Sequence, residues 1–187
     1  MKNMFELIAP CHFGLEAVLK REIQDLGYEI SCVEDGRVTF YGDGEAIAIA
    51  NVFLRSAERV LLKVGNVHAT TFEQLFDRVK ELPWEDYLPV NAKFWVTKAT
   101  SVKSKLFSPS DIQSIVKKAI VERLKGVYGI SWFQEDGAQY PIRIFFMKDE
   151  AVIGLDTTGE SLHKRGYRKM TAKAPISLRS SVAVLSA

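Results

Sequence analysis

A strongly marked helix start lies within residues 99–125, ATSVKSKLFSPSDIQSIVKKAIVERLK, and it restricts the fold of this chain more than any other feature. Ser108 is suited to cap the helix, Pro109 fits its first position, and Asp111 places a carboxylate beside the exposed backbone amides. Apolar residues then recur at helical spacing, at Ile112, Ile115, Val116, Ala119, Ile120 and Leu124. The sequence therefore predicts a helix with one buried stripe, ending before Gly126.

A polar, basic loop is predicted between a strand over residues 93–98 and this helix. Its hydrogen-bond donors are Lys98, Ser101, Lys103, Ser104 and Lys105. Ammonium and hydroxyl groups beside helix-start amides suit phosphate and ribose, so we interpret the loop as an RNA-facing edge. Phe107 can stack on a base, although its type and position favour packing in the core.

Charge is segregated along the chain although the net charge is only +2. Residues 1–92 carry nine basic and fifteen acidic side chains, whereas residues 93–125 carry eight basic and two acidic ones. Residues 126–159 are acidic overall, and residues 160–187 carry six basic side chains and one acidic one. This distribution is typical of proteins that bind nucleic acid or an anionic surface.

The sequence lacks the motifs that mark several kinds of catalytic, nucleotide-binding and metal-binding site. The chain has no P-loop, glycine-rich dinucleotide fingerprint or Cys/His metal cluster, and its three histidines lie far apart in sequence. We therefore assign no catalytic residue, no metal ligand and no cofactor-binding residue. The N-terminal apolar run is interrupted by Glu6 and followed by Pro10, so we expect no membrane span and a cytoplasmic location.

The first part of the chain predicts the order strand, helix, two strands, helix, strand. The predicted ranges are 5–9, 14–26, 28–33, 37–41, 43–54 and 59–67. Asp35-Gly36 is a hairpin signal between the second and third strands, which makes them antiparallel. This order is that of a ferredoxin-like fold, with two helices on one face of a four-stranded antiparallel sheet.

The second part predicts another α+β unit. A helix capped by Thr70-Thr71 is expected to run to Leu82, and Pro83 ends it. The basic loop and long helix follow, then an irregular stretch to Pro141 and a hairpin of strands 142–147 and 151–156. The last residues are expected to form a basic exit linker and the start of a further helix at residues 177–187.

The chain resembles the N-terminal half of bacterial THUMP-containing RNA methyltransferases that modify the 2-amino group of guanine in large-subunit ribosomal RNA. The resemblance rests on APCHFGLEAVLKREIQDLG, on TSVKSKLFSPSDIQSIVKKAIVERL, and on LHKRGYR followed by Ala174-Pro175-Ile176. It implies a ferredoxin-like domain at 1–69, a THUMP domain at 70–158, and a linker with the start of a methyltransferase domain at 159–187. After Ile176 the chain departs from the family pattern, which has a basic residue and Glu there.

The resemblance also implies a function. The two domains capture RNA, and a following domain binds S-adenosylmethionine in the parent protein. The implied RNA-binding residues are the five loop donors named above, together with Arg143, Lys164, Arg165 and Arg168. The resemblance thus predicts an rRNA methyltransferase parent, whereas these 187 residues alone are expected to bind no cofactor and to be inactive.

Three alternatives remain open at this point. The chain can be a freestanding RNA-binding or adaptor protein, or the RNA-capture part of another RNA-modifying enzyme such as a thiouridine synthase. A ferredoxin-like sensor of small molecules is a third reading, which the segregated positive charge disfavours.

Overall fold

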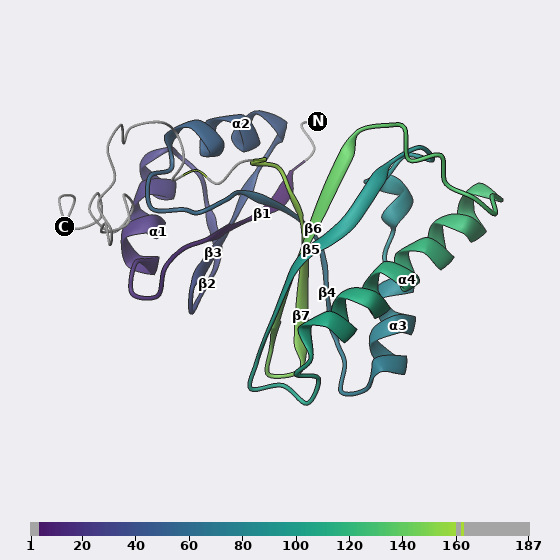
Figure 1. Ribbon diagram of the computed structural model, residues 1–187. Coiled ribbons are helices and arrows are strands. Elements are labelled where there is room, and N and C mark those ends of the chain that lie inside the picture. Colours follow the sequence, from purple (N-terminus) through teal and green to yellow (C-terminus); the bar gives the residue numbers. More distant parts are fainter. Residues whose placement is uncertain (1–3, 160–161, 163–187) are drawn as a thin grey trace, which may run out of the picture. The chain divides into compact units, whose positions relative to one another are not determined.

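The computed structural model describes residues 4–159 and Leu162, and the chain divides into two compact units (Figure 1). The first unit contains the chain up to Leu62 and again from Asp156, and the second contains Lys63–Leu155. Each unit is a sheet with two α-helices, so the predicted α+β class is confirmed. The boundaries 1–69, 70–158 and 159–187 stay predictions.

The first unit has the predicted element order. Its elements are β1 (Phe5–Pro10), α1 (Glu16–Asp25), β2 (Ile30–Glu34), β3 (Arg37–Gly42), α2 (Gly44–Phe53) and the beginning of β4 (Leu61–His68). The strands lie in the order β2-β3-β1-β4, and each neighbouring pair is antiparallel. This is the ferredoxin-like topology that the sequence predicts.

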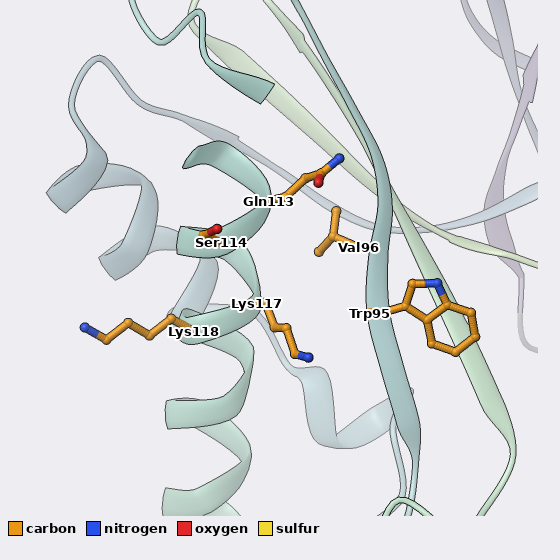
Figure 2. Close-up of a pocket in the computed structure, with 6 residues that line it drawn as sticks. All are labelled: Trp95, Val96, Gln113, Ser114, Lys117 and Lys118. Carbon is orange, nitrogen blue, oxygen red and sulfur yellow. The ribbon is translucent and has the colours of Figure 1, made fainter. Parts of the chain in front are cut away.

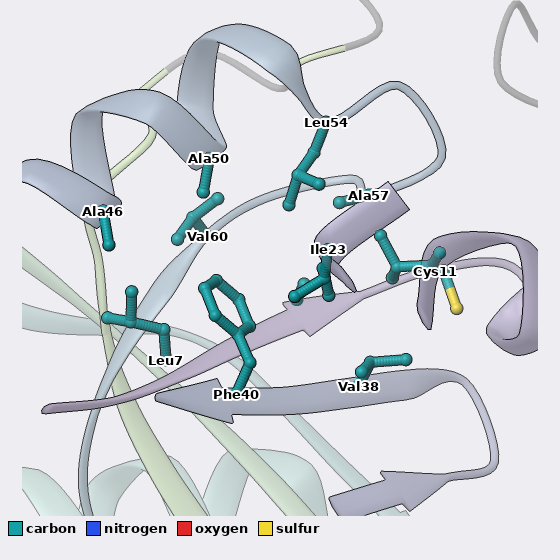
Figure 3. Close-up of a cluster of buried hydrophobic side chains, with 12 residues drawn as sticks. Leu7, Cys11, Ile23, Val38, Phe40, Ala46, Ala50, Leu54, Ala57 and Val60 are labelled. Atoms are coloured by element: carbon teal, nitrogen blue, oxygen red, sulfur yellow. The ribbon is translucent and has the colours of Figure 1, made fainter. Parts of the chain in front are cut away.

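Local sequence explains how α2 follows β3 so closely. Asp43 caps α2, because its carboxylate accepts a hydrogen bond from the Ala46 backbone N–H at 2.9 Å. A Cβ atom at Gly42 would lie 2.5 Å from the Ala46 Cβ, so only glycine fits between strand and helix. The helix thereby packs Ala46 and Ala50 onto the core formed by Leu7, Phe40 and Val60 (Figure 3).

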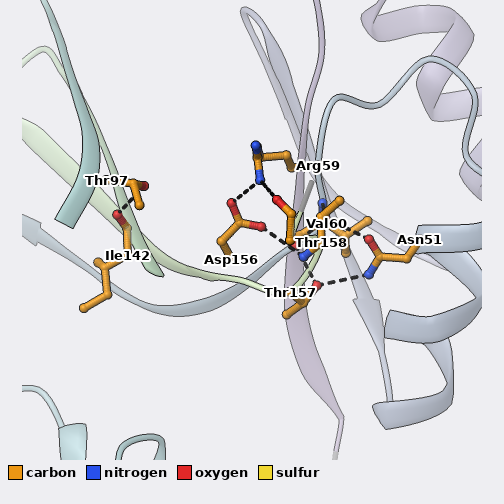
Figure 4. A network of polar contacts seen from close by, with 9 residues as sticks. Asn51, Arg59, Val60, Thr97, Ile142, Asp156, Thr157 and Thr158 are labelled. Carbon is orange, nitrogen blue, oxygen red and sulfur yellow. Dashed lines mark hydrogen bonds and ion pairs between the residues drawn. The ribbon is translucent and has the colours of Figure 1, made fainter. Parts of the chain in front are cut away.

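The end of β7 (Glu150–Asp156) and the residues after it are held within the first unit by a polar network (Figure 4). Arg59 donates to the Asp156 carboxylate at 2.7 Å. Thr157 donates its backbone N–H to the Val60 carbonyl at 3.1 Å, and the Thr158 hydroxyl donates to the Asn51 side chain at 2.8 Å. Residues 156–158 are therefore held by specific hydrogen bonds.

The second unit continues β4 and adds five α-helical or strand elements and one 3₁₀ turn. These are α3 (Phe72–Glu81), the turn η1 (Trp84–Asp86), β5 (Lys93–Val102), α4 (Pro109–Tyr128), β6 (Gln139–Met147) and β7. The strand order is β4-β7-β6-β5, with β5 parallel to β6 and β6 antiparallel to β7. The predicted crossover and hairpin are both present, and Thr71 caps α3 by accepting the Gln74 backbone N–H.

Three details of the second unit differ from the sequence prediction. Strand β5 extends to Val102 rather than Lys98, because it pairs with β6 as far as Met147. Helix α4 continues past Gly126 to Tyr128, and Gly129 with φ of 63° ends it. Ser108 occupies the cap position, but its hydroxyl contacts the Ser110 hydroxyl instead of a backbone amide. The predicted irregular stretch 126–141 is correspondingly too long.

Candidate nucleic-acid interface

A β-bulge at Thr97 decides which way the cations of β5 face. Val96 pairs with the buried Ile142, and the next paired residue is Lys98, opposite Arg143. The Thr97 hydroxyl donates to the Ile142 carbonyl at 3.0 Å. Without the extra residue Lys98 would share the face of Val96 and Ile142; with it, Lys98 and Arg143 lie side by side on the other face of the sheet.

The basic loop is defined here as Lys103–Ser108, the connection between β5 and α4. Ser104 donates its hydroxyl hydrogen to the Val102 carbonyl at 3.1 Å and accepts the Asp149 backbone N–H at 3.0 Å. Lys105 donates its backbone N–H to the Asp149 carboxylate at 2.7 Å. These bonds attach the loop to the β6–β7 turn, which is distant in sequence.

The β6–β7 turn brings a further cation to the loop. Lys148 donates its backbone N–H to the Val102 carbonyl at 3.2 Å, and the Asp149 carbonyl accepts the Ala69 backbone N–H at 2.9 Å. Three segments of the second unit therefore meet at one tip, and exposed lysines at 103, 105 and 148 surround it. The sequence alone does not indicate Lys148, because only strand pairing places it beside the loop.

The chain after Lys105 is anchored by a buried leucine. Leu106 is only 6% exposed, and its carbonyl accepts the Ser101 hydroxyl hydrogen. The side chains on either side of it, Lys105 and Phe107, are exposed, and Phe107 is 81% exposed. The expectation that Phe107 packs in the core is therefore wrong: Leu106 occupies the interior position and turns its neighbours outward.

The predicted site residues separate into four groups. Lys103, Ser104 and Lys105 converge at the tip, whereas Lys98 and Arg143 lie farther along the sheet, about 16 Å from Lys103 at the usual strand rise. Ser101 lies in β5 opposite the buried Phe146, not in a loop as predicted, because β5 continues through it. The linker residues Lys164, Arg165 and Arg168 lie outside the described residues.

A groove of about 460 Å³ runs between α4 and the edge strand β5 (Figure 2). Gln113 and Lys117 project from α4 toward β5, while Lys118 points away and lies 5.9 Å from the centre of the Phe76 ring. The groove wall also includes Trp95 and Val96. Its lysine at 117 adds positive charge to the same unit as the tip.

An ion pair connects η1 to α4 on another part of the second unit. Arg123 donates through Nε to the Glu85 carboxylate at 3.0 Å and through a second guanidinium nitrogen to its other oxygen. This bidentate hydrogen bonding lowers the pKa of the Glu85 carboxyl. Because the two charges neutralise each other, we assign this ion pair a structural role.

Titratable side chains form no catalytic constellation in the part of the chain that the structure describes. His12 pairs with Glu58 at 3.5 Å and His68 with Glu150 at 3.0 Å, and each contact involves exposed side chains. Among residues 4–159 and Leu162 no group of three His, Cys, Asp or Glu side chains is placed to hold a metal ion. Within the same residues no helix has the length and apolar character needed to cross a membrane.

Comparison with known protein families identifies both units. Residues 6–61 match the model of the RlmL ferredoxin-like domain, and residues 69–156 match the THUMP domain. This chain carries an RlmL-type ferredoxin-like domain followed by a THUMP domain. The resemblance inferred from sequence motifs is thereby confirmed at the level of the domain pair, and the basic tip belongs to the THUMP domain.

Two relatives carry methyltransferase names. The chain is 47% identical over 174 residues to the protein named RNA methyltransferase YpsC of Bacillus subtilis, covering 92% of this chain and 45% of that protein. It is 28% identical over 184 residues to ribosomal RNA large subunit methyltransferase K/L of Cellvibrio japonicus, covering 96% of this chain and 24% of that protein.

Solved structures agree with these relatives. A methylase of Clostridium difficile 630 superposes with a TM-score of 0.94 at 48% identity, covering 98% of this chain and 48% of that one. SMU.472, described as a methyltransferase complexed with SAH, superposes with a TM-score of 0.89 at 45% identity, covering 100% of this chain and 49% of that one. The chain thus spans about half the length of these proteins, or less.

Proposed function

We propose that this chain is the RNA-capturing part of a methyltransferase and that its THUMP domain binds RNA through the basic tip. One observation carries the proposal: Lys103, Lys105 and Lys148 are exposed around a loop that is bonded to Asp149 through the Lys105 backbone N–H and the Ser104 hydroxyl. Because the loop backbone is already hydrogen-bonded, little backbone freedom is lost when its lysines contact phosphates, and the tip is suited to an anionic partner.

The names of the relatives support the chemistry proposed for the parent protein. An RNA methyltransferase and a structure complexed with SAH are consistent with S-adenosylmethionine as the parent's methyl donor. The K/L name favours large-subunit ribosomal RNA as the substrate, and the resemblance favours the 2-amino group of guanine. Such a parent acts in the cytoplasm, where bacterial ribosomes are assembled.

The role proposed for these 187 residues is to bind RNA without transferring a methyl group. No catalytic constellation is present among the described residues, and the cations at the tip offer phosphate contacts rather than a site for a methyl donor. We therefore expect that the chain alone transfers no methyl group. Calorimetric titration with S-adenosylmethionine tests this point, and binding at micromolar strength would contradict it.

RNA binding by the tip should depend strongly on salt. Phosphate contacts release counterions, and each contact contributes roughly −0.7 to −0.9 to the slope of log affinity against log salt. The Lys103, Lys105 and Lys148 ammonium groups would then contribute a slope of roughly −2 to −3 together. Lys98 and Arg143 lie farther along the sheet, where Lys98 is exposed and Arg143 is half-buried.

The decisive experiment reverses charge at the tip and, in a matched variant, elsewhere. Lys103→Glu with Lys105→Glu should lower RNA affinity at least about tenfold at low salt and reduce the salt slope, because two phosphate contacts are lost. Lys20→Glu with Arg21→Glu makes the same charge change on exposed positions of α1 in the first unit. Fluorescence anisotropy with a ribosomal RNA fragment measures both.

The control variant separates a specific site from general electrostatics. The proposal requires that the tip variant loses affinity while the α1 variant keeps most of it. Equal losses in both would mean that only net charge matters. An unchanged affinity in a folded tip variant, with folding checked by circular dichroism, would exclude the tip as the RNA site.

A further inference from the structure

We propose that Phe107 is a stacking platform for an unpaired RNA base whose neighbouring phosphate is bound by Lys105. The inference rests on the proposed function, because it assumes that RNA binds at the tip. It adds a substrate class: RNA with a single-stranded nucleotide beside the contacted backbone. A base inside a continuous duplex has no free face to offer such a ring.

The exposure of Phe107 is imposed by the surrounding structure. Leu106 is 6% exposed and holds the interior position, and Lys105 is fixed by its backbone bond to Asp149 at 2.7 Å. The next residues begin helix α4 at Pro109. Phe107 is thus held between two anchored points with its ring 81% exposed. A phenyl ring presented in this way loses little conformational entropy on binding.

Charge distinguishes Phe107 from the other strongly exposed aromatic side chains. Phe13 is 79% exposed, but the tip of its ring lies against Gly36 in the first unit, where acidic side chains predominate in the sequence. Trp132 is 81% exposed and is followed closely in sequence by Glu135 and Asp136. Phe107 instead lies two residues after Lys105 and four after Lys103.

An aromatic face next to ammonium groups fits one partner chemistry. A nucleotide offers a flat base for stacking and, joined to it through the ribose, a phosphate that a nearby lysine can contact. These two groups match the Phe107 and Lys105 pair. An apolar protein surface would match the ring but would leave the lysines without counter-charges. Charge complementarity therefore favours an unpaired nucleotide as the occupant.

The test compares two RNAs and four single variants of the 187-residue chain. One RNA is a blunt hairpin, and the other is the same hairpin with a short single-stranded overhang. Phe107→Ala should weaken binding of the overhang RNA by roughly five- to a hundredfold, in line with the loss of one stacked base, and should change blunt-hairpin binding little. Phe107→Trp should retain binding, and Phe13→Ala serves as the equally exposed control.

The salt dependence gives an independent readout. Removing a stacked ring takes away no phosphate contact, so Phe107→Ala should keep the wild-type salt slope at lower affinity, whereas Lys105→Glu should make the slope less steep by roughly one contact. Equal weakening of both RNAs, or the same loss in Phe13→Ala, would overturn the stacking proposal while leaving RNA capture intact. Failure of the wild-type chain to bind either RNA would overturn the proposed function itself.

Discussion

The two units place different residue types at left-handed backbone positions in their turns. In the first unit, left-handed backbone positions at turns are occupied by glycine, as at Gly27 with φ of 87° and Gly36 with φ of 78°. At the tip of the second unit, Lys103, Lys148 and Asp149 adopt φ of 51°, 51° and 64°. A side chain in this region costs roughly 1–2 kcal/mol that glycine avoids.

This difference indicates that the side chains at the tip have a role that outweighs the cost of a strained turn. Asp149 uses its carboxylate to hold Lys105, and the two lysines carry exposed charge at the proposed RNA site. Backbone strain that persists at one site is a reason to look for a function there. We infer that the strained tip is retained for binding, whereas the glycine turns of the first unit serve folding alone.

Removing the anchoring carboxylate should produce the largest effect. Asp149→Ala loses a charged hydrogen bond to the Lys105 amide and leaves alanine in the left-handed region, so the free energy of unfolding should fall by about 2–3 kcal/mol. RNA affinity should also fall, although no cation is removed. Urea denaturation measures stability, and Asp149→Asn should largely restore it because asparagine tolerates this backbone conformation.

A matched change in the first unit completes that comparison. Asp35 is the exposed aspartate of the β2–β3 turn, and the adjacent Gly36 takes the left-handed position there. Asp35→Ala should therefore lower stability by less than about 0.5 kcal/mol, as expected at a surface site. Equal losses in Asp35→Ala and Asp149→Ala would mean that the tip has no special anchor.

Placing a lysine at a left-handed glycine position of the first unit, as occurs at the tip, should destabilise the protein. Gly36→Lys places a Cβ 3.3 Å from the Phe13 ring at a φ of +78°, so the free energy of unfolding should fall by about 1–2 kcal/mol. Asp35→Asn, at the exposed neighbouring position, makes the same change of +1 in net charge and serves as the control. Thermal unfolding compares the two variants; a Gly36→Lys protein as stable as the control would show that the strain argument fails.

Replacing a strained lysine by glycine should separate stability from binding. Lys148→Gly relieves the left-handed strain but adds freedom to the unfolded chain, which leaves a net gain of up to about 1 kcal/mol. RNA affinity should fall, and the salt slope should become less steep by roughly 0.7–0.9. Lys148→Gln removes the charge alone, so it should weaken binding equally without raising stability; if it binds RNA as wild type does, Lys148 is not part of the site.

Lowering the pH should have the smallest effect on the free energy of unfolding among these tests. It probes one carboxylate in the first unit, that of Glu16. Partial desolvation raises the pKa of Glu16, but backbone hydrogen bonds from Gly36, from its own amide and from Gly14 lower it more, so the folded pKa lies below the ordinary value of 4.5. The stabilisation is therefore present above pH 4.5 and is lost as pH falls through the folded pKa.

The comparison variant is Glu16→Gln, measured by urea denaturation across the acid range. Its stability at neutral pH should be slightly lower, and its decline below pH 4.5 should be shallower than that of the wild type. The difference should be small because the carboxylate is largely screened by solvent. Parallel acid profiles for the two proteins would remove Glu16 as a contributor, leaving other carboxylates such as Glu85 to explain the acid dependence.

Local patterns were sufficient for most of the fold. The order of strands and helices in the first unit, the capping role of Thr71 and the two hairpins each depend on residues within a few positions of one another. The prediction failed where distant pairing intervened. Strand β5 extends over polar residues to Val102 because β6 is its partner, and α4 passes Gly126 because a second glycine, Gly129, is available to end it.

The sequence by itself determined that a basic segment would precede a long helix, because charge and helix-start signals are properties of adjacent residues. It correctly placed Lys103 and Lys105 in a loop outside the core. Only the tertiary structure decided that the loop is hydrogen-bonded to the β6–β7 turn, that Lys148 joins it and that Phe107 faces solvent. Those properties depend on hydrogen bonds such as that from the Asp149 amide to Ser104, 45 residues away, and no local pattern records which strands will pair.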